Sequence, residues 1–411
     1  MDFTLPYTEE QELFRNEVRS WLEANIPEEM KNPVDSRDLD DDEFERHYYF
    51  WREKQLELAD KGWLAPTMPN QYGGGGLTGD HETILQEEFS RHRSSLNAPG
   101  GFLTPALLVW ATEEQKKMFL VPILKGEKVA SQGFSEPQSG SDLASIQSTA
   151  VRDGDDWVIN GSKVFQGNPP DNSWVYGPIM TDSDAPRHRN LGFFMIPARA
   201  PGVMFTRTRT FNGNRQNLLF FENVRVPGNH LIGGDHQGWQ VANTSLEQEH
   251  GGRGQAFPKD EHVDNLISYL QGAKETGGLT GTNPVFNQQA MAAYLDAHLH
   301  NLFSRRNYWM YQARQEMSYH GSQATMWHKI YGMVNADRAR DIMKVYALMG
   351  TRESRALYGG RPEAEQRRSL TWAHPGGTIE IQKVIVARRI GISRTQERAA
   401  PTPSTATKAG A

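Results

Sequence analysis

The periodicity of apolar residues changes twice along the chain, and these changes divide it into three parts. From Thr8 to about residue 128, apolar residues recur at three- to five-residue spacing, which is typical of amphipathic helices. Between 129 and 236, short apolar runs such as LGFFMIP are bounded by Gly, Pro or Asn, which predicts short antiparallel strands. Helical spacing then returns as far as about residue 394. The sequence therefore predicts a multi-domain α+β protein.

The three parts define the expected domains. A chain of 411 residues suits two or three units, because a domain commonly holds about 100–200 residues. We expect an N-terminal helical domain at 1–128, a middle antiparallel β-domain at 129–236 and a C-terminal helical bundle at 237–396. Residues 397–411 show no periodicity and are predicted to form a disordered tail.

Local signals predict where several elements begin and end. Thr8 is expected to cap the first helix, which Pro27 should end. The acidic stretch from 35 to 45 is interpreted as a solvated loop that leads into the next helix. In the β-domain, two dipeptides are each expected to form the turn of a β-hairpin because their residues tolerate positive φ. These dipeptides are Asp153-Gly154 and Asn160-Gly161.

Composition excludes several classes of protein. With 44 basic and 50 acidic side chains the formal charge is −6, so we expect no nucleic-acid partner. The absence of cysteine excludes disulfides, thiol catalysis and cysteine metal sites, and the histidines show no metal-ligand spacing. No run approaches the roughly 18 apolar residues of a membrane span, and the start lacks a secretion signal. We therefore expect a cytoplasmic protein with no metal and no membrane contact.

Four sequence strings follow one another on this helix, β-domain, helix frame. They are GFSEPQSGSD (133–142), WVINGSKVF (157–165), FFENVRVPGNHLIGGDHQGWQVA (220–242) and GGTIEIQKVIVARRIGI (376–392). In content, order and spacing they resemble the acyl-CoA dehydrogenase family of flavoproteins, and the resemblance extends to Ile392. It implies FAD as cofactor, an acyl-CoA substrate of lipid metabolism and an electron-transfer flavoprotein as electron acceptor. It also implies a homo- or hetero-oligomer, either dimer or tetramer.

The first string is a polar turn suited to a ligand. Gly140 removes a side chain where a ligand could approach, and the backbone N–H groups and serine hydroxyls offer hydrogen-bond donors. The resemblance assigns contacts with the flavin and the CoA arm to Phe134, Ser135, Gly140 and Ser141. Without the other three strings, an ordinary polar loop entering a strand would be the preferred interpretation.

The catalytic base that the resemblance implies is displaced in this chain. Most members of the family place a glutamate just before the C-terminal Gly-Thr, but Gly376 stands there. A minority carries the glutamate on the first helix after the β-domain, where Glu249 occupies the matching position. The neighbouring His250 stands where the family commonly has an arginine near the CoA arm, so it is assigned a substrate contact together with Ser141.

The pattern around Glu249 supports this role. Trp239, Ala242 and Leu246 step by three and four residues, and Glu249 continues the same helix face. A carboxyl group at that place loses water on folding, which raises its pKa toward the value that suits a general base. The alternative is a surface glutamate that pairs with Arg253.

The predicted flavin site departs from the family pattern. Phe165 replaces a tryptophan and Gly167 replaces a threonine or serine, although a phenylalanine can still stack and the Gly167 N–H could still donate to the flavin. Asn287 stands where a branch that acts on bulky or ring-bearing CoA esters has an arginine for the FAD pyrophosphate. Thr378 and Glu380 remain as candidate FAD contacts in the C-terminal string.

The resemblance implies one reaction and leaves two alternatives. The reaction is removal of an α-proton by Glu249 and transfer of the β-hydride to flavin, which gives the trans-2-enoyl-CoA. In the first alternative the chain is a degenerate subunit of a heteromeric dehydrogenase, with FAD held mainly by a partner chain. In the second it is a flavin oxidase or monooxygenase that acts on a substrate without CoA. The branch resemblance and the many aromatic residues favour a bulky acyl group.

Overall fold

The computed structural model describes most of the chain. The described residues are 6–94, 96, 100–167, 173–250 and 254–393. For residues 247–250 the backbone is described but the side chains are not. The predicted tail at 397–411 lies outside the described residues.

The N-terminal part is helical, as the sequence predicts. The Thr8 hydroxyl accepts a hydrogen bond from the Gln11 N–H at 3.2 Å, and the Gln11 side chain accepts one from the Thr8 N–H at 2.8 Å. The first helix ends at Asn25, just before Pro27, so both predicted helix ends are confirmed. The helices are α1 (Glu9–Asn25), α2 (Asp41–Asp60), α3 (Gly79–Arg91), α4 (Thr104–Trp110), α5 (Glu113–Gln115) and α6 (Val121–Leu124).

Residues 35–40 of the acidic stretch lead into α2, whereas residues 41–45 already belong to that helix. The stretch is also not solvated throughout. Asp35 is only 3% exposed, and it forms an ion pair with Arg367 at 2.6 Å and with Arg37 at 2.8 Å. Burial alone would raise the pKa of the Asp35 carboxyl, but the two arginines hold the pKa below its ordinary value. The prediction is therefore wrong for Asp35, because its partner Arg367 lies 332 residues away and leaves no local signal.

The middle part is a single eight-stranded sheet. Its strand order is β6-β7-β3-β2-β4-β5-β8, with β1 beside β4. Most neighbours are antiparallel as predicted, but β1 runs parallel to β4, and one bridge joins β2 and β4 in parallel. The strands are β1 (Val129–Gln132), β2 (Thr149–Asp153), β3 (Asp156–Gln166), β4 (Ser173–Met180), β5 (Leu191–Pro197), β6 (Val203–Arg209), β7 (Arg215–Pro227) and β8 (Leu231–Ile232).

Only one of the two predicted hairpin turns is a turn. Asp153 and Gly154 connect the antiparallel strands β2 and β3, as predicted. The pair Asn160 and Gly161 lies inside β3, where the register against β7 shifts, so that prediction is wrong. Gly161 has φ 142°, and a Cβ there would lie 2.2 Å from the Ser148 hydroxyl oxygen. The glycine therefore serves a close approach between segments instead of a turn.

The C-terminal part returns to helices, as predicted. The long helices α10 and α11 pack against each other, and α11 also packs against α12 and α13. Helix α7 packs against α4, β4 and β5, which places it between the sheet and the N-terminal helices. The helices are α7 (Gly238–His250), α8 (Glu261–Glu275), α9 (Leu279–Thr282), α10 (Pro284–Gln312), α11 (His320–Met343), α12 (Arg361–Trp372) and α13 (Ile379–Arg389).

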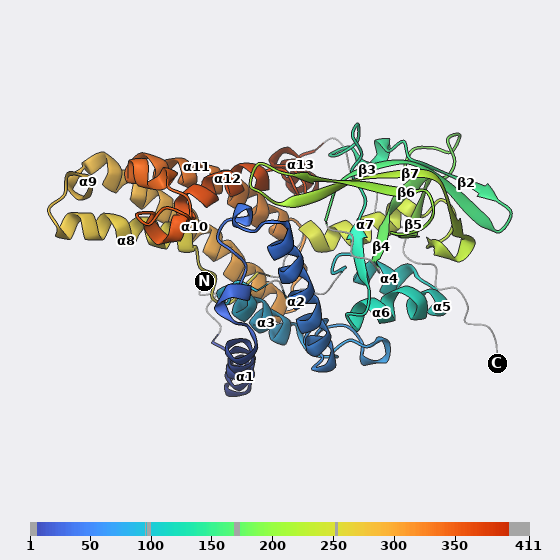
Figure 1. Cartoon of the computed structure of the whole chain (residues 1–411), viewed down its shortest axis with the longest axis horizontal. Helices are drawn as coiled ribbons and strands as arrows, with labels where there is room; N and C mark the ends of the chain where they lie inside the picture. The colour runs from blue at the N-terminus through green and yellow to red at the C-terminus, as the bar shows by residue number, and fades with distance from the viewer. Residues whose placement is uncertain (1–5, 95, 97–99, 168–172, 251–253, 394–411) are drawn as a thin grey trace.

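The three parts occupy different regions of the molecule. Figure 1 shows the sheet at one end, helices α8 and α9 at the opposite end, and α1 to α3 below the middle. The predicted boundary at 128/129 falls between α6 and β1, and that at 236/237 falls between β8 and α7. The fold class is confirmed, while the exact division into domains stays a prediction.

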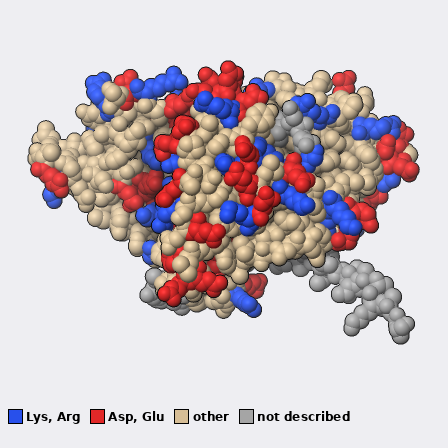
Figure 2. Space-filling view, turned by 60° about the horizontal axis from the view of Figure 1, so that its bottom comes forward, with Lys and Arg blue, Asp and Glu red and all other residues tan. Residues whose placement is uncertain are grey.

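The surface carries charges of both signs. On the face in Figure 2, acidic and basic side chains are interspersed. Among the described helices, none combines the length and the apolar character that crossing a lipid bilayer requires.

Candidate active site

A buried ion pair holds the polar loop 133–142 against the sheet. The Lys163 ammonium of β3 lies 2.9 Å from a carboxylate oxygen of Glu136, and both side chains are 1% exposed. Lys163 also donates to the backbone carbonyls of Phe134 at 3.3 Å and Pro178 at 3.0 Å. One buried cation therefore connects the loop to β3 and to β4.

The Glu136 carboxylate also binds the far end of this loop region. It accepts hydrogen bonds from the backbone N–H groups of Gln147 at 2.6 Å and Ser148 at 3.2 Å. Burial alone would raise the pKa of Glu136, but the Lys163 charge and these donors hold it below its ordinary value. The sequence strings contain both charged residues, yet our sequence reasoning assigned a role to neither. Lys163 stands within an apolar run of β3, and a lysine in such a run indicates a buried cation that needs an acidic partner.

Four predicted flavin contacts of the β-domain, at residues 135, 140, 165 and 167, are at least partly exposed. We call this surface the open edge, although its strand β3 lies between β7 and β2 within the sheet. The Val164 N–H donates to the Ser135 carbonyl at 2.9 Å, which places the loop beside Phe165. The Phe165 side chain is 67% exposed, and its φ of 59° is unusual for a residue with a side chain. A Cβ at Gly140 or at Gly167 would meet no atom within 4 Å. There is therefore free space at both glycines, and the exposed ring of Phe165 lies two residues before Gly167.

Two other predicted contacts of the same loop lie differently. The Phe134 ring is 6% exposed and packs edge-on against Tyr176 and Phe193, with ring centroids 6.0 and 6.1 Å away. A ligand therefore cannot reach the Phe134 ring without repacking of this core. Ser141 is exposed on the loop surface.

Helix α7 presents its predicted apolar face to the interior. Ala242 and Ser245 are fully buried, and Trp239 and Leu246 pack against the same core. The hydroxyl of Thr244 accepts a hydrogen bond from the Trp110 ring N–H of α4 at 2.9 Å, which fixes α7 on that helix.

Two predicted site residues lie in the last turn of α7. The backbones of Glu249 and His250 are helical, but their side chains lie outside the described residues. Ser245 is four residues before Glu249, so the two share one helix face. The burial of Ser245 shows that this face points inward one turn before Glu249.

The loop between β4 and β5 adds basic residues that sequence reasoning missed. Arg187 forms an ion pair with Asp142, next to Ser141. The His188 ring stacks on Trp239 of α7, with centroids 4.4 Å apart. Burial and the nearby Arg187 lower the pKa of His188. The run PRHRN carried a signal, since it gathers cationic side chains in one loop.

The C-terminal loop that contains Gly376 is held by internal hydrogen bonds. The side chain of Gln382 donates to the Gly376 carbonyl at 2.7 Å. The buried Lys329 ammonium donates to the carbonyls of Gly377, at 2.7 Å, and Pro375. Gly376 has φ 65°, a conformation that side chains rarely adopt. The backbone at this position is therefore shaped for glycine.

The remaining predicted FAD contacts lie on helices that pack around α11. The Thr378 hydroxyl accepts a hydrogen bond from the Ile381 N–H at 3.3 Å and so caps α13. Glu380 is exposed in the first turn of that helix. The Asn287 amide donates to the Gly281 carbonyl at 3.3 Å. The structure thus joins Ser135 to the strand that carries Phe165, whereas Thr378 and Asn287 have local partners.

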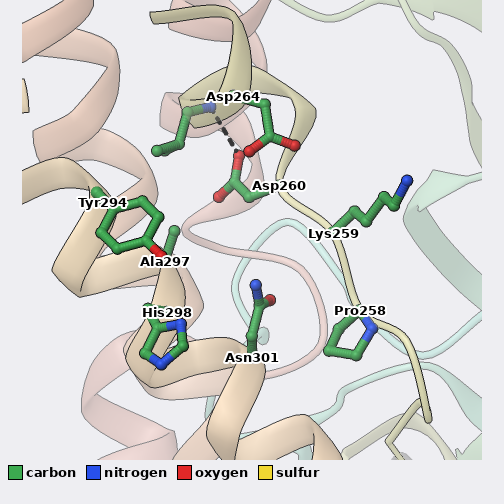
Figure 3. Close-up of a pocket in the computed structure, with 9 residues that line it drawn as sticks. Pro258, Lys259, Asp260, Asp264, Tyr294, Ala297, His298 and Asn301 are labelled. Carbon is green, nitrogen blue, oxygen red and sulfur yellow. Dashed lines mark hydrogen bonds between the residues drawn. The ribbon is translucent and has the colours of Figure 1, made fainter. Parts of the chain in front are cut away.

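A small cavity lies elsewhere, between the start of α8 and α10 (Figure 3). Its volume is about 140 Å³. A pocket for a drug-sized ligand measures roughly 300–1,000 Å³, so this cavity does not fit a whole CoA thioester. It is lined by Pro258, Lys259, Asp260, Val263, Asp264, Tyr294, Ala297, His298 and Asn301.

Comparison with protein families gives two matches. The model described as acyl-CoA dehydrogenase, N-terminal domain, matches residues 8–127. The model described as acyl-CoA dehydrogenase, middle domain, matches residues 131–224. Together the two matched ranges span more than half of the 411 residues.

Individual proteins give the same result. Acyl-CoA dehydrogenase FadE26 of Mycobacterium tuberculosis is 28% identical over 93% of this chain and 96% of its own length. Acyl-CoA dehydrogenase IpdE1 of the same organism is 31% identical over 62% of this chain and 68% of its own length.

Solved structures share the fold. The Tcur3481-Tcur3483 steroid ACAD has a TM-score of 0.80 at 23% identity, and the alignment covers 97% of this chain and 100% of that chain. The ChsE4-ChsE5 complex from Mycobacterium tuberculosis has a TM-score of 0.76 at 24% identity, covering 95% and 100%.

Proposed function

Because the chain belongs to the acyl-CoA dehydrogenase family and is an oxidoreductase of that type, we propose that it oxidises an acyl-CoA thioester to the trans-2-enoyl-CoA. In this proposal Glu249 removes the proton α to the thioester carbonyl. The observation that carries the proposal is the course of α7, whose buried face at Ala242 and Ser245 continues to Glu249. The alternative family position, Gly376, has no side chain that could act as a base.

The family typically binds FAD, and the β-domain edge of this chain fits the flavin end of that cofactor. The fit rests on the exposed Phe165 ring and on the open space at Gly140 and Gly167. We propose that Phe165 stacks on the ring system and that Ser135 and the Gly167 N–H donate hydrogen bonds to it. When bound, FAD supplies the acceptor for the hydride from the β carbon.

We propose that the CoA arm lies along Ser141 and the loop between β4 and β5. The exposed guanidinium groups of Arg187 and Arg189 suit the phosphates of CoA, and Arg187 is tied to the flavin loop through Asp142. His250 is proposed to add a hydrogen bond from the end of α7. The stacking of His188 on Trp239 supports this arrangement, because it joins the cationic loop to the helix that carries Glu249.

We propose a bulky or ring-bearing acyl group and an electron-transfer flavoprotein as acceptor. The acyl proposal rests on the strings NPVFNQ and GGT, which resemble the branch of the family that acts on such esters. One of the similar solved structures is described as a steroid ACAD, although its 23% identity carries the fold alone. The cytoplasmic location stays a prediction from the sequence.

A heteromeric assembly is a second candidate that specific contacts favour. The Asn287 amide is bonded to Gly281, and the Thr378 hydroxyl caps α13, so neither group is directed by these bonds to a cofactor phosphate. A partner chain could supply the phosphate-binding residues instead. One similar solved structure is itself described as a complex of two chains, ChsE4 and ChsE5. In that arrangement this chain would contribute the flavin end and Glu249.

The test of the base is Glu249→Gln, with Glu247→Gln as the matched control on another face of the same helix. We expect acyl-CoA-dependent reduction of an artificial electron acceptor to fall about 100- to 10,000-fold in the first variant. Flavin content should stay at the wild-type level, and the control should keep its activity. Turnover that survives Glu249→Gln would refute the assignment of the base.

The visible flavin spectrum of the purified protein separates the two assemblies. A homo-oligomer should carry flavin as isolated. If the chain carries no flavin when it is purified by itself, but binds flavin when it is mixed with the product of a neighbouring gene, the heteromeric assembly is established.

A further inference from the structure

The segment that follows α7 is held tightly against α10. Gly254 has φ 78°, and a Cβ there would lie 2.0 Å from the Ser304 carbonyl oxygen, so a side chain has no room. The next residue, Gln255, donates its backbone N–H to the Ser304 hydroxyl at 3.0 Å. Gly254 is five residues after Glu249, and five residues span at most about 18 Å. The position of this segment therefore limits where the end of α7 can lie.

A second anchor of this segment comes from the N-terminal domain. The Phe257 backbone N–H donates to a carboxylate oxygen of Glu87 at 3.3 Å. Glu87 lies on α3 and is 8% exposed. The same carboxylate accepts hydrogen bonds from Arg15 of α1 at 2.7 Å and from the Tyr7 hydroxyl at 3.3 Å. Glu87 thus joins the segment behind α7 to α1 and to the residues just before it.

Packing strengthens this junction. The Phe257 and Tyr7 rings meet edge-on with centroids 5.4 Å apart, and the Arg15 guanidinium lies 4.6 Å above the Tyr7 ring. Ala256 is 8% exposed in a cluster with Tyr7, Ile84 and Tyr308. At its other end the segment reaches Asp260, which caps α8 (Figure 3) and accepts a hydrogen bond from Tyr331 at 3.0 Å.

We propose that Glu87 is a positioning residue for the reaction: its hydrogen bond to Phe257 holds the segment after α7 and so restrains the helix end that carries Glu249. This proposal rests on the proposed role of Glu249. Glu87 touches neither substrate nor cofactor in it and acts through the backbone.

The neighbouring Glu88 provides a matched comparison. It is fully buried and binds Arg15 at 3.0 Å, Arg19 at 3.1 Å and Arg91 at 2.8 Å. These ion pairs join α1 to α3, and the contacts described for Glu88 do not include the segment 254–258. The two adjacent acids therefore share burial and the Arg15 partner. They differ at the Phe257 N–H, which donates to the Glu87 carboxylate.

Two substitutions at Glu87 distinguish the effect of the length of its side chain from the effect of its negative charge. Glu87→Asp keeps the charge but withdraws the carboxylate by one methylene, so it cannot hold Phe257 and Arg15 together. Glu87→Gln loses the charge but keeps an oxygen at the right distance from the Phe257 N–H. A positioning role predicts that Asp impairs turnover and that Gln restores most of it, whereas a role confined to the ion pair with Arg15 predicts the opposite order.

The experiment measures kcat, KM and the pH profile of kcat with an acyl-CoA and an artificial acceptor. For Glu87→Asp we expect kcat to fall about five- to tenfold with KM within twofold. The acidic limb of the profile should move to lower pH, because a displaced Glu249 carboxyl is better solvated. Glu88→Asp should lower the melting temperature but keep kcat within twofold. An equal loss of kcat in Glu87→Asp and Glu88→Asp overturns the proposal.

Hydrogen exchange provides a readout that does not depend on the chemistry of Glu249. We expect amides at the end of α7 and at 255–257 to exchange faster in Glu87→Asp than in wild type, and to stay protected in Glu88→Asp. Unchanged protection in Glu87→Asp overturns the positioning role even if activity falls. If Glu249→Gln remains active while this exchange difference is found, the assigned base is wrong but the anchoring by Glu87 stands.

Discussion

The open edge of the β-domain and the loop around Gly376 both belong to the family strings, but they differ in how their polar groups are satisfied. At the edge, the buried pair of Lys163 and Glu136 supports the backbone from behind, and Phe165 faces outward beside open space. Around Gly376, Lys329 and Gln382 bind the loop carbonyls.

This difference supports the proposal that a ligand binds at the open edge. The polar groups behind the edge leave its outer surface available to a ligand. The polar groups of the C-terminal loop are directed into the protein and stabilise the loop itself. We propose that the open edge binds a ligand, whereas the hydrogen bonds of the C-terminal loop stabilise the loop itself. Three predictions test this contrast, from the largest expected effect to the smallest.

The two buried lysines should respond differently to removal. Lys163→Met leaves the Glu136 carboxylate buried without its counter-charge, which costs about 3–5 kcal/mol of unfolding free energy. It should also release bound flavin, because the loop 133–142 loses its anchor. Lys329→Met removes hydrogen bonds to carbonyls and should cost about 1.5–3 kcal/mol, with flavin retained. Urea unfolding and the visible flavin spectrum measure both effects. If Lys163→Met and Lys329→Met lose the same unfolding free energy and the same amount of flavin, the proposed difference between the open edge and the C-terminal loop is wrong.

Acid should destabilise the fold through His300 before it protonates Glu136 behind the open edge. Burial, together with the neighbouring His328, lowers the pKa of His300 from 6.5 to about 4. Between these values the unfolded chain binds more protons than the folded one, so stability falls as pH drops from 6.5 toward 4. The pKa of Glu136 lies below 4.5, so its contribution persists in most of that window.

The expected loss from His300 is about 1–3 kcal/mol between pH 6.5 and 4. It is measured as the unfolding free energy in urea at several pH values. His300→Gln should reduce the slope in this window, where burial also lowers the pKa values of His230 and His328, while the wild-type slope below pH 4.5 should remain. A slope that is identical in wild type and His300→Gln contradicts the assignment.

The smallest effect separates two glycines. Gly376→Ala forces a side chain into φ 65° and should cost about 1 kcal/mol. Gly167→Ala places its methyl group in open space and should change stability by less than about 0.5 kcal/mol. Gly167→Ser should slow the loss of flavin on dilution, because a hydroxyl adds a donor at the edge. Thermal melts and flavin release rates provide the comparison.

Features of the fold with local causes could be predicted from the sequence. Thr8 has its capping partner Gln11 three residues away, and Asp153 with Gly154 forms a turn by its own backbone preferences. The apolar stripe of α7 followed from helical spacing alone. The family strings added the order of the three parts.

Features that depend on distant partners could not be predicted. The dipeptide at Gly161 has the composition of a turn, but a close approach to Ser148 and pairing with β7 keep it within a strand. Glu136 and Lys163 lie 27 residues apart, and no spacing rule joins them. For the candidate site, the strings located the edge, while the burial of the Phe134 ring depended on packing against two other strands.

The ion pair of Asp35 has a consequence for the order of events during protein synthesis. Arg37 is made almost at once, but Arg367, on α12, is made 332 residues after Asp35. Domains tend to fold as they leave the ribosome, with the N-terminal one first. The N-terminal helices can therefore pack while the loop at Asp35 still lacks its second arginine. The ion pair between Asp35 and Arg367 can form only after the C-terminal helices have been synthesised and have packed against the N-terminal part. The loop at Asp35 therefore reaches its final contacts late in folding.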